Sequence, residues 1–118
     1  MDKIMKSILL SLQKRDEILK KKGSARSYNH HFILIRKNVK KMIEENSQDM
    51  LLPLLESENI SYRSDMAVML YHCYADRCMK IIKELSEMTP ENGLPECYID
   101  IVVSARMTLQ YGIPDDFP

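Results

Sequence analysis

The sequence lacks the long apolar run that a membrane-spanning helix needs. No apolar stretch in its 118 residues approaches the roughly 20 residues that cross a bilayer. The run from Ile8 to Leu10 is too short, and too interrupted by charge, to form the core of a secretory signal. Cysteine is scarce as well: Cys73, Cys78 and Cys97 form an odd set at irregular spacing, which favours free thiols. We therefore expect a cytoplasmic protein that makes no contact with a membrane.

Motifs that carry familiar chemistry are also missing. The chain has no glycine-rich phosphate loop, no Ser–His–Asp set and no carboxylate–histidine metal motif. The group His72, Cys73 and Cys78 fits no zinc spacing. Neighbouring side chains on a helix point about 100° apart, which argues against His72 and Cys73 as a nucleophile pair. The same divergence separates the side chains of His30 and His31. We expect no enzymatic activity, no cofactor and no bound metal, with one of these two histidines beside the core and the other in solvent.

The net charge is zero, but the two signs are separated along the chain. Residues 1–43 hold twelve Lys or Arg against three acidic residues, a net charge of +9, and residues 44–118 carry −9. Two opposite halves favour docking within the chain, head-to-tail association or two different partners, while the plainest interpretation is that both surfaces are solvated.

What the sequence does contain is helical periodicity. Its apolar fraction of 45% and its length suit one globular domain with a real core. The segment 51–85 is the clearest part, because five residues recur at the three- and four-residue steps of one helix face, namely Arg63, Met66, Ala67, Leu70 and Tyr74. The predicted units are a first helix at 2–21, a second at 24–46, a central hairpin at 47–74, a last hairpin at 75–112 and a tail at 113–118.

Local signals predict where these helices begin and end. Gly23 is expected to take a left-handed cap after the first helix, and Ser24 to start the second. In the central hairpin the helices are predicted at about 47–56 and 61–74, and Pro53 is tolerated if Asp49 is the N-cap, or else it bends the helix. Asn59 and Ser61 are both candidate caps for the second of these helices.

The last hairpin is predicted to hold helices at about 75–88 and 96–111, separated by a Pro- and Gly-containing loop and closed by Gly112. Phe117 in the tail is expected to fold back onto the last helices. The residues predicted to be buried in the final helix are Tyr98, Ile101, Val102, Ala105 and Leu109.

The central hairpin resembles a known repeat motif. Leu-Pro-Leu-Leu, a short acidic turn and then Tyr62-Arg63-x-x-Met66-Ala67-x-x-Leu70 resemble a HEAT-type repeat. With Asn29 and the segment 104–109, the chain is similar over about residues 25–112 to short bacterial HEAT-like proteins known only as a domain of unknown function. The resemblance implies an all-α fold of about six helices, arranged as three antiparallel hairpins in a short α–α superhelix. Ala67 and Ala105 lie 38 positions apart, near the HEAT period of about 40.

This sequence departs from the HEAT pattern at two positions. Met66 stands where the pattern prefers Ala, and Tyr62 where it prefers Val. The resemblance implies that Arg63 pairs with a neighbouring acid, for which Asp65, Asp49 and Glu58 are the candidates. An Arg that contacts a ligand is the alternative.

Three tyrosines lie in the same predicted hairpin. Tyr62, Tyr71 and Tyr74 form a contact patch in one interpretation, since tyrosine is favoured in binding hot spots. In the other they lie at the rim of the core with their hydroxyl groups in water.

Two functions fit these features. The first is a non-enzymatic protein-binding module, such as an adaptor or a toxin-immunity protein, because short α-solenoids offer helix surfaces for partners. The alternative is nucleic-acid binding through the basic second helix, where Arg36 and Lys40 would add phosphate contacts. The protein partner and the choice between monomer and homodimer stay open. The candidate partner-binding residues on the second helix are Arg26, His30, Lys37 and Lys41.

Overall fold

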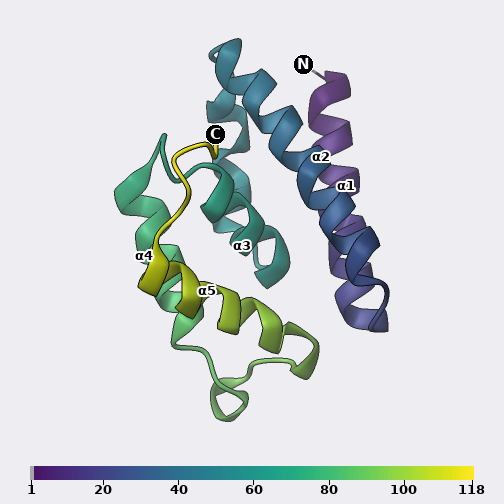
Figure 1. Cartoon of the computed structure of the whole chain (residues 1–118), viewed down its shortest axis with the longest axis vertical. Helices are drawn as coiled ribbons and strands as arrows, with labels where there is room; N and C mark the ends of the chain where they lie inside the picture. Colours follow the sequence, from purple (N-terminus) through teal and green to yellow (C-terminus); the bar gives the residue numbers. More distant parts are fainter. Residues whose placement is uncertain (1) are drawn as a thin grey trace.

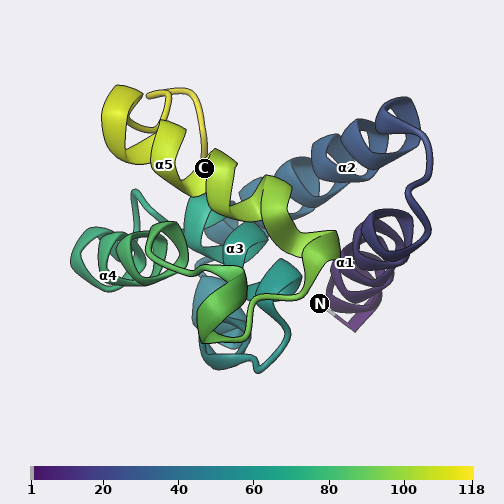
Figure 2. The same cartoon turned by 90° about the horizontal axis from the view of Figure 1, so that it is seen from below.

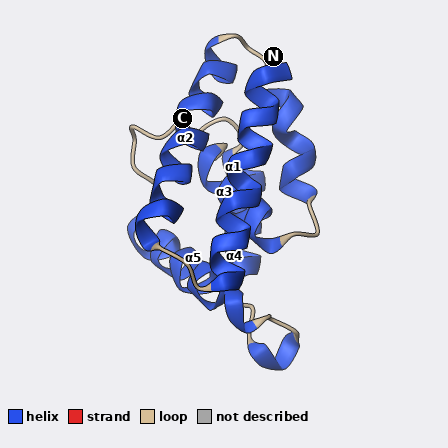
Figure 3. Cartoon of the chain, turned by 90° about the vertical axis from the view of Figure 1, so that its right-hand side faces the viewer, coloured by secondary structure: helices blue, strands red, loops and turns tan. Residues whose placement is uncertain are grey.

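A computed structural model describes residues 2–118, and every regular element in that range is helical (Figure 3). The all-α prediction is therefore confirmed, and the three-hairpin superhelix stays a prediction. None of the helices in this range is long and apolar enough to cross a membrane. The elements are α1 (Asp2–Lys21), α2 (Ala25–Glu44), the 3₁₀ helix η1 (Gln48–Glu56), α3 (Ile60–Met69), α4 (Ala75–Ser86), the 3₁₀ turns η2 (Pro90–Asn92) and η3 (Glu96–Tyr98), and α5 (Ile99–Tyr111).

Helices α1 and α2 lie side by side and run in opposite directions (Figure 1). The predicted left-handed cap at Gly23 is wrong, since Lys22 takes that conformation with φ +53°. Gly23 instead donates its N–H to the Ile18 carbonyl at 2.8 Å, and a Cβ there would lie 3.2 Å from Ile18 Cγ2. The glycine thus supplies space for the returning chain. Ser24 caps α2 as predicted, because its hydroxyl accepts the Ser27 N–H.

Element η1 is a 3₁₀ helix, where the sequence predicted an α-helix. It begins after Ser47, so the prediction of Asp49 as the N-cap is wrong and Pro53 lies beyond the first turn. The fixed φ of proline matches the 3₁₀ value, which lets the helix continue through Pro53.

Helix α3 starts as predicted and ends early. The Asn59 side chain caps it by accepting the Tyr62 N–H at 3.1 Å. The helix stops at Met69, five residues before the predicted end at Tyr74. Cys73 and Tyr74 both donate to the Leu70 carbonyl, so a tight turn replaces the last helical turn.

The main core lies between α1, α2, η1, α3 and α4, and a smaller cluster lies between η3, α5 and the chain just before them. Ala67 is fully buried in the main core, as its place on the α3 stripe predicted. Of the five residues predicted to be buried in the final helix, Tyr98 (which lies in η3) and three residues of α5 are buried, whereas the prediction for Leu109 is wrong because its side chain is 42% exposed. The buried aliphatic centre of the main core consists of Ile8, Leu12, Ile35, Val39, Leu51, Leu55, Leu70, Ile82 and Leu85.

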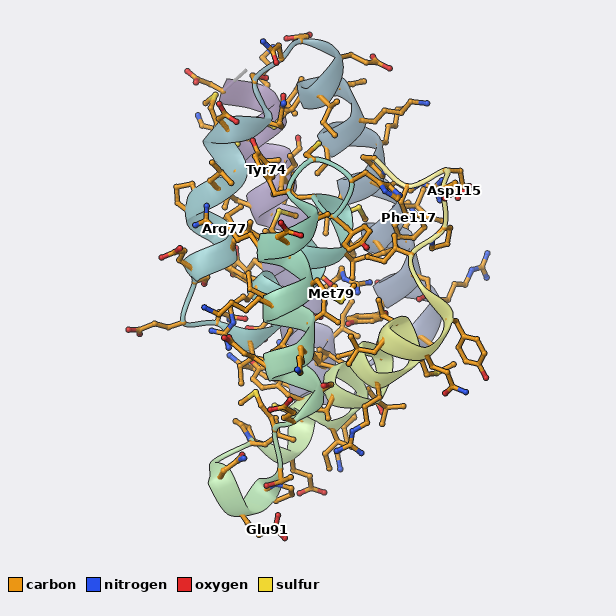
Figure 4. The ribbon with its side chains drawn as sticks, turned by 90° about the vertical axis from the view of Figure 1, so that its left-hand side faces the viewer. Tyr74, Arg77, Met79, Glu91, Asp115 and Phe117 are labelled. Atoms are coloured by element: carbon orange, nitrogen blue, oxygen red, sulfur yellow. The ribbon has the colours of Figure 1, made fainter. Side chains whose placement is uncertain are left out.

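The tail returns to α2, where the sequence predicted a return to the last helices (Figure 4). The Phe117 ring lies 6.0 Å from the Phe32 ring, centroid to centroid. Arg36 explains this placement, since its guanidinium lies 4.7 Å from the Phe117 ring centroid and 2.9 Å from an Asp116 carboxylate oxygen. The Pro114 carbonyl also contacts His72 Nε2 at 3.0 Å.

Replacing Ala67 by Trp tests the packing of α3. We expect the melting temperature to fall, because overpacking a close-packed core costs about 1–3 kcal/mol or more. Thermal unfolding followed by circular dichroism measures the change. Ala75→Trp, at the exposed start of α4, is the matched control and should unfold at nearly the wild-type temperature. Equal melting temperatures for both variants would contradict the close approach at Ala67.

Candidate functional site

The four candidate residues on the second helix are solvent-exposed and share one face of α2. Arg26, His30, Lys37 and Lys41 follow one another at steps of four and seven, which is the repeat of a single helix face. The neighbouring His31 is partly buried, and its Nδ1 has no hydrogen-bond partner within residues 2–118. The pair thus divides between core and solvent as predicted.

Arg63 makes none of the three predicted ion pairs. Its Nη1 donates to the Ser57 carbonyl at 2.8 Å, so it ties α3 to the chain that precedes it. Of the predicted partners, Asp65 binds a different arginine and Asp49 accepts a hydrogen bond from the Tyr74 hydroxyl. The prediction is wrong because Arg63 lies away from Asp65 on the helix, and a backbone carbonyl is nearer.

The three candidate tyrosines have separate surroundings. Tyr62 lies near the charged groups of α1, and burial and the Asp16 carboxylate raise its pKa. The Tyr71 ring packs edge-on against His72, with 5.4 Å between ring centroids, while Tyr74 bonds to Asp49 in η1. All three are partly buried against the core, which fits the rim-of-core interpretation better than a shared contact patch.

The most deeply buried charges belong to Arg15 in α1 and Asp65 in α3, each with only 6% of its side chain exposed. Two parallel bonds join them: Arg15 Nε to Asp65 Oδ2 at 2.8 Å and Arg15 Nη2 to Asp65 Oδ1 at 3.0 Å. Arg15 Nη1 also donates to the Tyr28 carbonyl of α2 at 2.8 Å. One guanidinium thereby connects three helices.

Aromatic rings of α2 cover this guanidinium. The Arg15 Cζ atom lies 3.6 Å from the Tyr28 ring centroid and 4.7 Å from that of Phe32, so both rings contribute cation–π contact. Burial raises the pKa of the Asp65 carboxyl, and the nearby Arg15 offsets only part of that rise.

The next residue of α1, Asp16, organises a second polar group. Its carboxylate accepts hydrogen bonds from the Tyr98 hydroxyl at 2.5 Å, from Asn59 at 3.1 Å and from the Lys20 ammonium at 3.0 Å. Burial raises the pKa of Asp16, but these three bonds outweigh it and hold the pKa below its usual value. Asp16 therefore anchors both the start of α3 and the turn that leads into α5.

Sequence reasoning missed both anchors, although a signal for one was present. Arg15 continues the stripe of α1 that Ile8 and Leu12 define at steps of four and three. A charged residue on a buried stripe predicts a buried partner of opposite charge. That partner, Asp65, lies 50 positions further along the chain, and no local sequence pattern around Arg15 identifies it.

A groove lies along one side of α5 and faces the first two turns of α2. Figure 2 shows how these two helices are placed relative to each other. It consists of two cavities of about 490 and 320 Å³. Tyr28 and Asp100 line both cavities, so the cavities meet at this pair. The first cavity opens between the α1–α2 turn and the start of α5, where Lys22 and Glu96 lie.

The second cavity is lined by five parts of the chain: α1, α2, α3, α5 and the tail. Helix α5 diverges from α2, and the tail returns from the end of α5 to α2 (Figure 1). The Arg15–Asp65 pair and α3 form its floor. The polar side chains and the tail residues that line it are Asn29, Ser64, Ser104, Thr108, Ile113, Pro114 and Phe117.

Tyr28 and Asp100 hold unused hydrogen-bonding groups at the junction of the cavities. Within residues 2–118, neither the Tyr28 hydroxyl nor the Asp100 carboxylate has a hydrogen-bond or ion-pair partner. Burial first, and the nearby Asp65 and Asp100 carboxylates next, raise the pKa of Tyr28 to about 12. The phenol is therefore neutral at physiological pH.

The outer face of α5 beside the groove is apolar. Four residues at steps of four positions form a stripe along the helix, and we call it the α5 stripe. Its members and exposed fractions are Ile99 (42%), Val103 (47%), Met107 (54%) and Tyr111 (74%).

Comparisons with protein-family models, with curated proteins and with solved structures find no match for this chain. Within residues 2–118, no three His, Cys, Asp or Glu side chains gather in a way that would hold a metal ion. Cys73, Cys78 and Cys97 are free thiols, and burial raises the pKa of the Cys78 thiol to about 11.

Breaking the Arg15–Asp65 pair should destabilise the fold strongly. Asp65→Ala leaves the guanidinium buried without a counter-ion, which costs about 3–5 kcal/mol. The double variant Arg15→Met, Asp65→Ala removes both charges and should lose less stability than the sum of the single variants Arg15→Met and Asp65→Ala. Urea unfolding followed by circular dichroism measures all four proteins. Glu17→Ala, on the exposed side of α1, is the control, and strictly additive losses would contradict a direct pair.

Proposed function

We propose that this chain is a non-enzymatic protein-binding module, with the groove between α2 and α5 and the adjoining α5 stripe as its binding surface. The observation that carries the proposal is the α5 stripe. Helix α5 packs three residues inward, namely Ile101, Val102 and Ala105, and presents the stripe on the opposite side. Contiguous exposed apolar surface of this kind commonly marks a protein interaction site.

The shape of the groove supports a peptide or helix as its occupant. Helix α5 has 13 residues and is about 20 Å long. A groove of that length accommodates several turns of a partner helix or a short extended segment. The polar side chains along it, such as Asn29 and Ser104, offer the orienting hydrogen bonds that such sites use.

The biological setting belongs to the same proposal. A HEAT-like α–α superhelix in the bacterial cytoplasm, acting as an adaptor or as an immunity protein against a toxin, needs only such a surface and no chemistry. This assignment is an analogy at the level of the fold, supported by the short repeat-like segment around Met66 and Ala67.

The binding surface is tested by capture from extract of the native cells. The purified chain should retain one discrete protein, and the double variant Val103→Glu, Met107→Glu should capture about tenfold less, because two charges would enter the apolar interface. Leu10→Glu, which changes an equally exposed apolar residue of α1, is the matched control. Equal retention by the wild type and by the Val103→Glu, Met107→Glu variant of the α5 stripe would contradict this surface.

A second function, nucleic-acid binding, is favoured by one specific observation. Eight exposed Lys and Arg residues of α1, α2 and their connection make no ion pair within residues 2–118. Such a surface attracts the phosphates of nucleic acid. The eight residues are Lys3, Lys6, Lys21, Lys22, Arg26, Lys37, Lys40 and Lys41.

Salt dependence tests this second function. If four phosphates are contacted, affinity for a DNA duplex or single-stranded RNA should fall about a hundredfold between 50 and 200 mM salt. The double variant Lys37→Gln, Lys41→Gln should make the plot of log affinity against log salt concentration less steep, by about 2 in the magnitude of its slope. Lys80→Gln, an exposed lysine of α4, is the control. Absence of binding at the lower salt concentration would remove this function.

A further inference from the structure

We infer that the groove takes a protein segment with an arginine or lysine flanked by apolar residues, and that Asp100 and Tyr28 receive the cation. This inference rests on the proposed protein-binding function and names the chemistry of the partner. It commits to one feature of that partner, a positive charge at the junction of the two cavities.

The position of the two residues is the first support. Tyr28 and Asp100 line both cavities, so any segment that follows the groove passes over them. Asp100 offers a carboxylate and Tyr28 a phenolic oxygen, and neither has a partner within residues 2–118. A guanidinium or ammonium group supplies only donors, which is what these two oxygen atoms accept. The neutral phenol adds an acceptor without a second charge.

The charge around the groove is the second support. The buried Asp65 is already neutralised by Arg15, which leaves Asp100 and Glu96 as the groove's unpaired acids against Lys22 at one end. An acidic segment or a phosphate backbone would meet Asp100 with no cation beside it, so a basic segment is favoured.

The α5 stripe supplies the apolar part of the recognition. Ile99 precedes Asp100 in the chain and also lines the first cavity, while Val103 follows one turn later. Apolar side chains on either side of the partner's cation would cover these residues and shield the charge pair from water. Shielding strengthens a charge-assisted hydrogen bond relative to one that is fully hydrated.

The test is a selection of phage-displayed random dodecapeptides on the purified full chain, followed by affinity measurements on a selected peptide. Enriched sequences should contain Arg or Lys next to apolar residues. Replacing that Arg by citrulline, or Asp100 by Asn, should each weaken binding about tenfold, and combining the two should cost little more than either alone. Tyr28→Phe should weaken binding to a smaller extent. Glu91→Gln, at the tip of the η2 loop (Figure 4), removes the same charge outside the groove and should change affinity less than about twofold.

The remaining outcomes separate this inference from the proposed function. Selected peptides that lack a cation, and that lose affinity for the Val103→Glu, Met107→Glu variant, would overturn the inference and leave the α5 stripe as a protein-binding surface. The inference would also be overturned if the losses of binding free energy from citrulline in the peptide and from Asp100→Asn in the chain were fully additive. The cation would then bind somewhere other than Asp100. If no peptide is enriched, or if no groove substitution affects binding, the inference and the proposed function both fail.

Discussion

The contact between Arg15 and Asp65 is the constraint on which the rest of the structure depends. It joins α1 to α3 through two charge-assisted hydrogen bonds, and a third bond and the Tyr28 and Phe32 rings bring α2 to the same guanidinium. A buried ion pair seldom adds much net stability, because both charges must leave water. Its effect is geometric, because an arrangement that kept one of these charges buried and removed its partner would cost several kcal/mol.

The groove is a consequence of this polar centre and of its neighbour, Asp16. The Arg15–Asp65 pair forms the floor of the second cavity, while Asp16 holds Tyr98 and thereby fixes where α5 begins. Two consecutive residues of α1 thus anchor α3 and the start of α5, while α3 and the tail span the space between α2 and the far end of α5. The opening between the helices is therefore held in place by buried polar bonds, which suits a preformed binding surface.

The opposite charges of the two halves remain largely separate in the folded chain. Outside the pairs formed by Arg15, Lys20, Arg36 and the loosely paired Lys14, the basic residues of α1 and α2 face solvent, and the groove retains unpaired acids such as Asp100. Two surfaces of opposite sign on one small fold would select different partners, since each repels what the other attracts. Protein binding at the groove and polyanion binding at α1 and α2 are consequently separable by substitution.

The sequence by itself determined the all-helical fold, the cap at Ser24 and the burial of Met66, Ala67 and Leu70, because these depend on residues three or four positions apart. It left the cap of α3 open between Asn59 and Ser61. Tertiary structure alone decided which acid meets Arg15, why Leu109 stays exposed, and that Phe117 returns to α2. It also decided the groove, whose walls come from residues more than 70 positions apart. The physical reason is that a local pattern specifies which side of a helix is apolar, whereas the partner of that side depends on how all the helices satisfy their buried polar groups together.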